Sequence, residues 1–342
     1  MKSSSYRSLA VVVLFACMTV VSIDLVLAHI VPVLHRREVQ EGVRDLERSD
    51  PETLVIGSSH ARTFHVLGAE LAARTNAQRT LVAVPLEFGK LRSYAWMLDH
   101  RIAPLVDDEG PKGQLKRANL KRLLILTEWW DSCPGPDWNL PSRVWTFSNF
   151  LGSLANTGLT SYNRNYLQSR WKRLFWDSAL AQDRGTKELF NTARDRLLHR
   201  TTVTPEAIQH TTEVWQHSIE AGTECIGDTE QMAGLRHLLD FGRTHQLETT
   251  VILFPRKPGT MTEKAKATTL TAFRNLVAEL IAPYHARLVD LTWSTPLTDQ
   301  DFMADFDHVS IEGNVKFARW ALDGPLSFLT QAPQAEFSQV SP

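Results

Sequence analysis

The chain has little cysteine and almost no net charge, and these two shortages exclude several classes of function. Its 342 residues include three cysteines and no Cys-x-x-Cys pair, which argues against thiol redox chemistry and cysteine-rich structural zinc. Lysine and arginine (37) balance aspartate and glutamate (38), for a formal net charge of -1. Nucleic-acid binding proteins carry a basic surface, so we expect no nucleic-acid partner.

Long hydrophobic runs are also scarce, with one exception at the N-terminus. Residues 9–28 are predominantly apolar and contain one acid, Asp24, and a bilayer core requires about 20 such residues. Basic residues before the run favour a cytoplasmic N-terminus, although two arginines beyond it weaken that signal. A signal peptide cleaved after Ala28 is the alternative. We expect an uncleaved membrane anchor over residues 1–34, and an exported chain in either case.

The other two cysteines flank a part of the chain with a different pattern. Cys17 lies in the expected anchor, whereas Cys133 and Cys225 could form a disulfide after export or remain two separate buried thiols. Between them, residues 134–227 lack strand signals and carry helical periodicity with interleaved Trp, Arg and Lys. We interpret this segment as a helical insertion. It could be a lid, a groove for a sugar polymer, a docking face or a packed helical cap.

The remaining chain alternates strand-like and helix-like segments. Residues 35–50 are densely charged and predict a solvated juxtamembrane helix or linker, and 331–342 form a C-terminal tail. Strands are expected at 54–56, 80–84, 123–126, 249–254 and 288–291. Helices are expected at 61–74, 86–100, 270–281 and 313–322, and a further helix begins at a capping box formed by Asp228 and Gln231. A basic loop is expected at 112–122. This alternation over 51–330 predicts an α/β fold with a parallel sheet covered on both faces. Ligands of such sheets lie at the carboxyl ends of the strands.

Two short motifs at opposite ends of this pattern carry chemistry. Ser59 follows the first strand, and His308 ends an Asp-x-x-His motif before the last helix. A serine hydroxyl attacks an ester only when a base takes its proton, and a carboxylate orients that base. We therefore predict Ser59 as nucleophile, His308 as general base and Asp305 as the partner carboxylate. Asp307 is the rival carboxylate, but neighbouring side chains tend to point apart.

Both motifs have plainer interpretations. Ser59 could be a helix N-cap, and His308 a hydrogen-bonded surface histidine. Asp305, Asp307 and His308 could also bind a metal ion, but no further acidic or histidine cluster shows ligand-like spacing. We expect neither a metal nor a cofactor.

Together the motifs resemble those of the SGNH (GDSL-type) hydrolase superfamily. Members carry a Gly-Asp-Ser block at the first strand and Asp-x-x-His before the last helix. Here Ser58 replaces the aspartate, which is similar to the membrane-anchored branch of polysaccharide O-acetylation and teichoic acid D-alanylation proteins. The resemblance implies a flavodoxin-like three-layer fold, with oxyanion donors at the amides of Ser59 and Gly89. His60 would contact substrate or make a local hydrogen bond.

The resemblance also has a gap and a functional implication. The asparagine of the family's third block is missing, and residues 127–131 read Thr-Glu-Trp-Trp-Asp instead. The implied activity is O-acetylation of an exported polysaccharide through an acyl-Ser59 intermediate. The implied partner is a multi-pass membrane acyltransferase, and the implied location is the bacterial inner membrane, with the catalytic domain in the periplasm or exterior. The alternatives are a carbohydrate or carboxylic ester hydrolase, and a non-catalytic scaffold that binds polymer or a partner.

Overall fold

The protein is described from a computed structural model. The described residues are 34–87, 89–135, 147–160, 163–168, 205–303 and 308–333, together with isolated positions between 11 and 22. The chain divides into two compact units, one of residues 1–40 with 141–201 and one of residues 41–140 with 202–342. The second unit contains the sheet and the predicted site.

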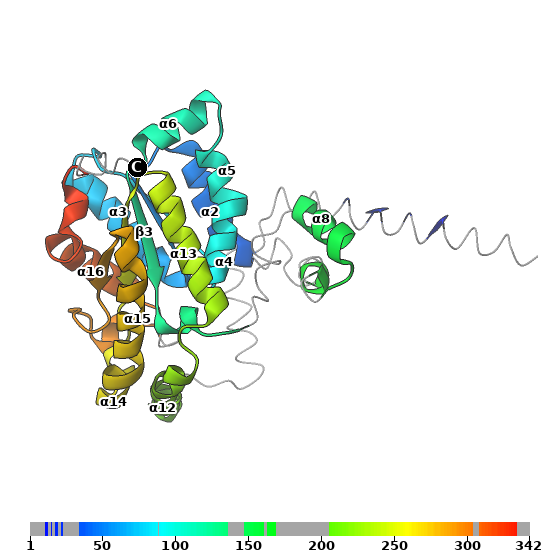
Figure 1. Ribbon diagram of the computed structural model, residues 1–342. Helices are drawn as coiled ribbons and strands as arrows, with labels where there is room; N and C mark the ends of the chain where they lie inside the picture. Colours follow the sequence, from blue (N-terminus) through cyan, green and yellow to red (C-terminus); the bar gives the residue numbers. More distant parts are fainter. Residues whose placement is uncertain are drawn as a thin grey trace, which may run out of the picture. The chain divides into compact units, whose positions relative to one another are not determined.

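A parallel sheet forms the centre of the second unit (Figure 1). Its strands are β1 (Thr53–Gly57), β2 (Leu81–Pro85), β3 (Arg122–Thr127), β4 (Glu248–Leu253) and β5 (Arg287–Asp290), in the spatial order β2-β1-β3-β4-β5. In the register of β1, Ile56 lies opposite Val84 of β2 on one side and Ile125 of β3 on the other. The predicted α/β class and parallel sheet are confirmed, and the strand order is consistent with a flavodoxin-like fold.

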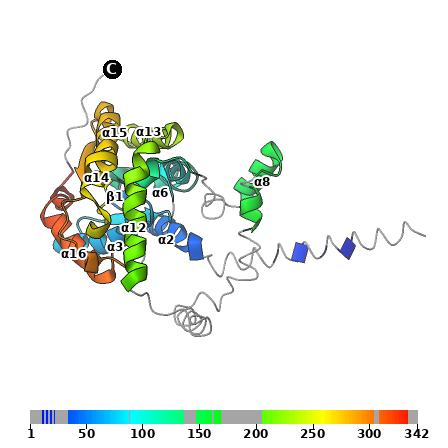
Figure 2. The ribbon, with the colours of Figure 1, turned by 90° about the horizontal axis from the view of Figure 1, so that it is seen from below.

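Helices pack on both faces of this sheet. On one face, α3 (Thr63–Arg74) and α16 (Ile311–Asp323) bury apolar side chains together with Val55, Leu124 and Ile252. On the other face lie α4 (Leu91–Met97) and α13 (Thr229–Thr244), which contact each other. The remaining described helices include α2 (Leu34–Arg48), α5 (Ala103–Val106), α6 (Pro111–Asn119), α8 (Phe147–Thr157), α12 (Pro205–Ala221), α14 (Glu263–Ala265) and α15 (Thr271–Ile281). Figure 2 shows α12 crossing in front of the sheet.

Three local predictions differ from the structure. The expected basic loop at 112–122 is mostly α6, which begins at Pro111, a residue whose fixed φ suits the first turn of a helix. The helix expected at 86–100 begins only at Leu91, after a turn that contains Gly89. Asp228 caps α13 as predicted, but the side chain of Gln231 accepts a hydrogen bond from the amide of Arg92 at 3.0 Å instead of closing a capping box.

The charged stretch 35–50 is helical, as α2, but one of its faces is buried. Val43 and Leu46 are inaccessible to solvent, and Lys116 of α6 donates to the carbonyl of Ser49 at 2.7 Å. A Cβ atom at Gly42 would lie 2.6 Å from the carbonyl oxygen of Ala83. The absence of a side chain there lets α2 lie directly against β2, so this part of α2 belongs to the packed domain and is not a solvated linker.

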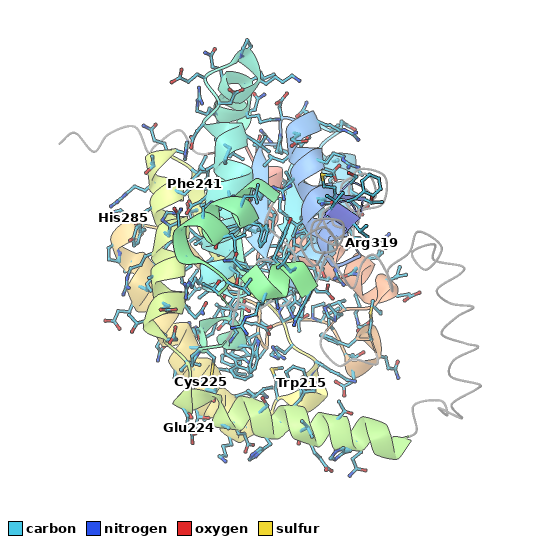
Figure 3. All side chains as sticks on the ribbon, turned by 90° about the vertical axis from the view of Figure 1, so that its right-hand side faces the viewer. Trp215, Glu224, Cys225, Phe241, His285 and Arg319 are labelled. Atoms are coloured by element: carbon cyan, nitrogen blue, oxygen red, sulfur yellow. A yellow bond between two sulfur atoms is a disulfide. The ribbon has the colours of Figure 1, made fainter. Side chains whose placement is uncertain are left out.

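The described part of the predicted insertion contains the helices α8 and α12 and no strand, and its ends are covalently joined. Cys133 follows β3, Cys225 follows α12, and the two form a disulfide across 92 residues of sequence. Figure 3 shows Trp215 on α12 and Cys225 near the end of this helix. The sequence left the state of these cysteines open, and the structure pairs them.

The predicted membrane anchor lies almost entirely outside the described residues. Among the residues that are described, no helix has both the length and the apolar character needed to cross a membrane.

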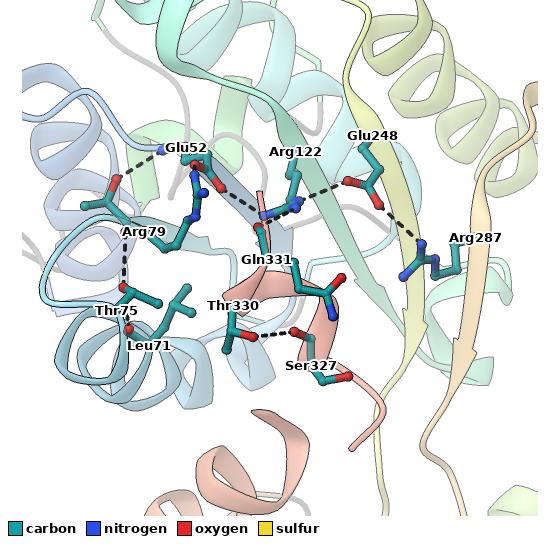
Figure 4. Close-up of polar contacts among 11 residues, drawn as sticks. Glu52, Leu71, Thr75, Arg79, Arg122, Glu248, Arg287, Ser327, Thr330 and Gln331 are labelled. Carbon is teal, nitrogen blue, oxygen red and sulfur yellow. Dashed lines mark hydrogen bonds and ion pairs between the residues drawn. The ribbon is translucent and has the colours of Figure 1, made fainter. Parts of the chain in front are cut away.

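A buried network of ion pairs links residues at the amino edge of the sheet (Figure 4). The guanidinium of Arg122 is 2% exposed and donates to Glu52 at 2.8 Å, to Glu248 at 3.0 Å and to the carbonyl oxygen of Gln331 at 3.0 Å. Arg79 and Arg287 extend the network from the two carboxylates. Each buried charge is therefore matched, which offsets the cost of removing it from water.

We expect Arg122→Met to lower the free energy of unfolding by about 3–5 kcal/mol, the usual cost of removing one member of a buried ion pair. Urea denaturation would measure the change. The matched control is Arg243→Met, because Arg243 pairs with Asp240 on an exposed surface and such pairs contribute about 1 kcal/mol or less. Equal losses in the two variants would show that the network does not stabilise the fold.

Candidate active site

Ser59 and His308 meet at the carboxyl edge of the sheet. Ser59 begins the short helix η1 (Ser59–Arg62) directly after β1, and His308 lies between β5 and α16. The Oγ of Ser59 and the Nε2 of His308 are 2.7 Å apart, although the residues are 249 positions apart in sequence. This distance suits a serine hydroxyl that donates to an imidazole nitrogen, the contact expected of a nucleophile and its base.

The turn after β1 places the serine. A Cβ atom at Gly57 would lie 2.6 Å from the Cβ of Leu126, so only glycine permits β1 and β3 to approach this closely. Ser58 then acts as the N-cap of η1 and accepts a hydrogen bond from the amide of His60 at 3.4 Å. The amide of Ser59 makes no hydrogen bond within the described residues. As a free donor at a helix N-terminus, it suits a developing negative charge.

His60 is buried next to the Ser59–His308 pair. Its ring is 4% exposed, stacks on Phe254 at 4.7 Å and lies 5.4 Å from the ring of His308. Its Nε2 is 3.5 Å from a carboxylate oxygen of Glu128. Of the two roles predicted for His60, this burial favours local packing and polar contact over contact with substrate.

Gly89 lies in the turn after β2, as expected, but its amide is engaged there. The amide donates to the carbonyl oxygen of Leu86 at 2.8 Å, and the carbonyl of Gly89 accepts from the hydroxyl of Tyr94 at 3.0 Å. In this conformation the second oxyanion donor would have to be another group. The role of Gly89 as a donor stays a prediction that requires the turn to open.

Asp305 and Asp307 lie outside the described residues, so the choice of partner carboxylate stays a prediction. The chain on either side is held in place. The amide of Met303 donates to the carbonyl oxygen of His308 at 2.8 Å, and the amide of Ser310 donates to the carbonyl oxygen of Asp301 at 2.7 Å. These bonds position His308 from both directions. The possible metal site depended on the same aspartates, and the described residues contain no group of three ligands that could share a metal ion.

A charged pair occupies the place of the missing asparagine after β3. Glu128 follows β3 and forms an ion pair with Arg256, which follows β4. The guanidinium of Arg256 lies over the ring of Trp215 from α12, 5.1 Å from the ring centre. Both charged side chains are largely buried. The sequence analysis did not predict this pair. Both residues lie just after predicted strands, and this position was the signal that could have identified them.

Asp131 is a second buried acid that the sequence analysis did not identify as functional. It is fully enclosed, and its Oδ2 accepts from the amide of Glu128 at 3.1 Å. Burial raises its pKa from 3.8 to about 7, and this rise is opposed by His60, Tyr94 and Lys90. The acid is therefore close to half ionised near neutral pH.

Sequence comparisons do not assign this site. The chain matches no model of a known protein family and no curated protein. The geometry of the site therefore carries the functional argument.

Asp131 should make stability depend on pH. Because its folded pKa is about 7 and its ordinary value is 3.8, the folded protein keeps a proton that the unfolded chain loses. Its contribution to stability is present below about pH 4 and is lost as the pH rises toward about 7. Asp131→Asn removes this titration, so between about pH 5 and about pH 8 the variant should lose about 2 kcal/mol less unfolding free energy than the wild type.

Urea denaturation at both pH values measures this difference. Asp240→Asn is the control, because that carboxylate is partly exposed and pairs with Arg243 on the surface. Parallel pH profiles for the wild type and Asp131→Asn would contradict the assignment.

Proposed function

We propose that this chain is an SGNH-type enzyme that transfers acyl groups through an acyl-Ser59 intermediate. The observation that carries the proposal is the 2.7 Å contact between the Oγ of Ser59 and the Nε2 of His308 at the carboxyl edge of a parallel sheet. The serine follows the first strand, β1, and begins a short helix. The family that the sequence resembles carries its nucleophile after the first strand.

The reaction needs one base and one nucleophile in contact. His308 takes the hydroxyl proton as the Oγ of Ser59 attacks the carbonyl carbon of an acyl donor. The tetrahedral intermediate collapses, the bond to the leaving oxygen breaks, and His308 returns the proton to that oxygen. A sugar hydroxyl then gives its proton to His308 and attacks the carbonyl carbon of the acyl-serine. The bond to the Oγ of Ser59 breaks, and His308 passes the proton to this oxygen, which restores both residues and leaves the acyl group on the sugar. Asp305 would hold the imidazole in the required tautomer.

The negative oxygen of each intermediate needs hydrogen-bond donors, and the loss of one donor typically costs about 100- to 1000-fold in rate. The amide of Ser59 supplies the first, because no described residue accepts its proton. The amide of Gly89 could supply a second if its bond to Leu86 opens.

The acceptor we propose is an exported polysaccharide. Trp130 follows β3 at the edge that carries Ser59, and 45% of its side chain is exposed. An exposed aromatic ring beside a catalytic edge can stack on a sugar ring. The apolar run at residues 9–28 supports single-pass attachment to the bacterial inner membrane, with the domain in the periplasm or exterior. A multi-pass membrane acyltransferase would supply the acyl group.

The first test is labelling of the solubilised full chain with a fluorophosphonate probe, which reacts with activated serines. Ser59→Ala should abolish labelling, and His308→Ala should slow it by about 100- to 10,000-fold because the base is lost. The matched controls are Ser327→Ala and His237→Ala. Ser327 lies in a short helix near the C-terminus, and His237 pairs with Asp99 on an exposed surface. Labelling that survives Ser59→Ala would refute the proposed nucleophile.

Hydrolysis is the second candidate function, because the same serine and histidine would release the acyl group to water. Offering an acyl donor with and without a polysaccharide acceptor separates the two activities. Acylated polymer as the main product would support transfer, and free acid at all acceptor concentrations would support an esterase.

A non-catalytic scaffold is a third candidate, favoured by the missing third-block asparagine and the Trp-rich insertion. It would gain support if Ser59→Ala left polymer modification in cells unchanged while deletion of the insertion abolished it.

A further inference from the structure

Tyr94 lies where the segments that follow three strands come together. It is in the first turn of α4, and its side chain is fully buried. Its hydroxyl donates to the carbonyl oxygen of Gly89, after β2, at 3.0 Å. The same hydroxyl interacts with the side chain of Ser58, after β1, and with the carboxylate of Asp131, after β3. Polar groups from the segments that follow three adjacent strands thus lie around one oxygen atom.

These interactions shift the pKa of the Tyr94 hydroxyl in opposite directions. Burial and the nearby Asp131 carboxylate raise the pKa of Tyr94 well above its usual value, whereas the contact with Ser58 lowers it. The phenol stays neutral, and it donates its one proton to the carbonyl oxygen of Gly89. The side chains of Ser58 and Asp131 lie close enough to the same hydroxyl to influence its pKa.

The tyrosine ring also explains why residue 89 is glycine. A Cβ atom at this position would lie 2.5 Å from the Cε1 of Tyr94 and 2.8 Å from the Cγ of Leu86. A side chain would force either the ring or the turn to move. Gly89 is thus required for packing against Tyr94, whatever its amide does during a reaction.

We infer that Tyr94 is a positioning residue that holds Ser58, and with it the nucleophile Ser59, in a fixed place relative to the turn at Gly89 and the segment at Asp131. The inference rests on the proposed function, since it concerns the same site. Tyr94 touches neither substrate nor the reacting atoms. It acts through the backbone of the turns that carry the nucleophile and the proposed oxyanion donors.

The expected effect is large because catalytic geometry tolerates little displacement. A misplacement of about 1 Å can cost about 100-fold in rate. Tyr94→Phe keeps the ring that packs on Gly89 and removes only the oxygen. The carbonyl of Gly89 would lose its hydrogen-bond donor in a buried place, and the polar interactions of the hydroxyl with Ser58 and Asp131 would be lost with it, so the three segments would relax independently.

The experiment measures fluorophosphonate labelling of the full chain over a range of probe concentrations. For Tyr94→Phe we expect the maximal labelling rate to fall about 10- to 100-fold, with the half-saturating probe concentration changed by less than about twofold. Tyr284→Phe is the matched control, because Tyr284 lies in a short helix before β5, at the amino edge of the sheet. Rates are normalised to the folded fraction, so that lost stability alone does not alter them.

Ser58→Ala provides a second variant that leaves the aromatic ring in place and should lower the maximal rate in the same way. Unchanged maximal rates in both folded variants, with an active wild type, would overturn the positioning role and leave the proposed function intact. Absence of Ser59-dependent labelling in the wild type would overturn the proposed function and this inference with it.

Discussion

The structure depends on the parallel alignment of β1 between β2 and β3. Because the three strands run in the same direction, the segments that follow them emerge at one edge. Gly57 makes the alignment tight, since any side chain there would overlap Leu126. The nucleophile candidate, the turn at Gly89 and the acidic segment after β3 owe their proximity to this arrangement. His308 completes the set from the segment between β5 and α16.

The two edges of the sheet use buried charge differently. At the amino edge, Arg122 satisfies two carboxylates and a backbone carbonyl, and the network only binds strands together. At the carboxyl edge, Glu128 pairs with Arg256 and lies near His60, whose ring is 5.4 Å from that of His308. Buried charges are costly unless matched. The two charges of this pair match each other close to the candidate active site.

The covalent link between Cys133 and Cys225 joins the end of β3 to the end of α12. Through Trp215, α12 also covers the guanidinium of Arg256. The last helix of the insertion is thus linked to the segment after β3 by the disulfide and to Arg256 by the ring of Trp215. This arrangement gives a physical reason for an insertion between β3 and β4: its last helix covers one side of the candidate active site and helps to exclude water from the buried ion pair.

Sequence by itself determined the alternation of strands and helices, the parallel sheet, and the two motifs that carry Ser59 and His308, because apolar periodicity and turn residues are local properties. The prediction missed α6, although Pro111 is a local signal for its start. It failed through tertiary packing at α2, one face of which is buried against β2. The pairing of Cys133 with Cys225, the ion pair of Glu128 with Arg256 and the contacts of Tyr94 required tertiary structure. The disulfide and the ion pair each join residues that are far apart in the sequence, and only the packed fold brings such residues within reach of one another.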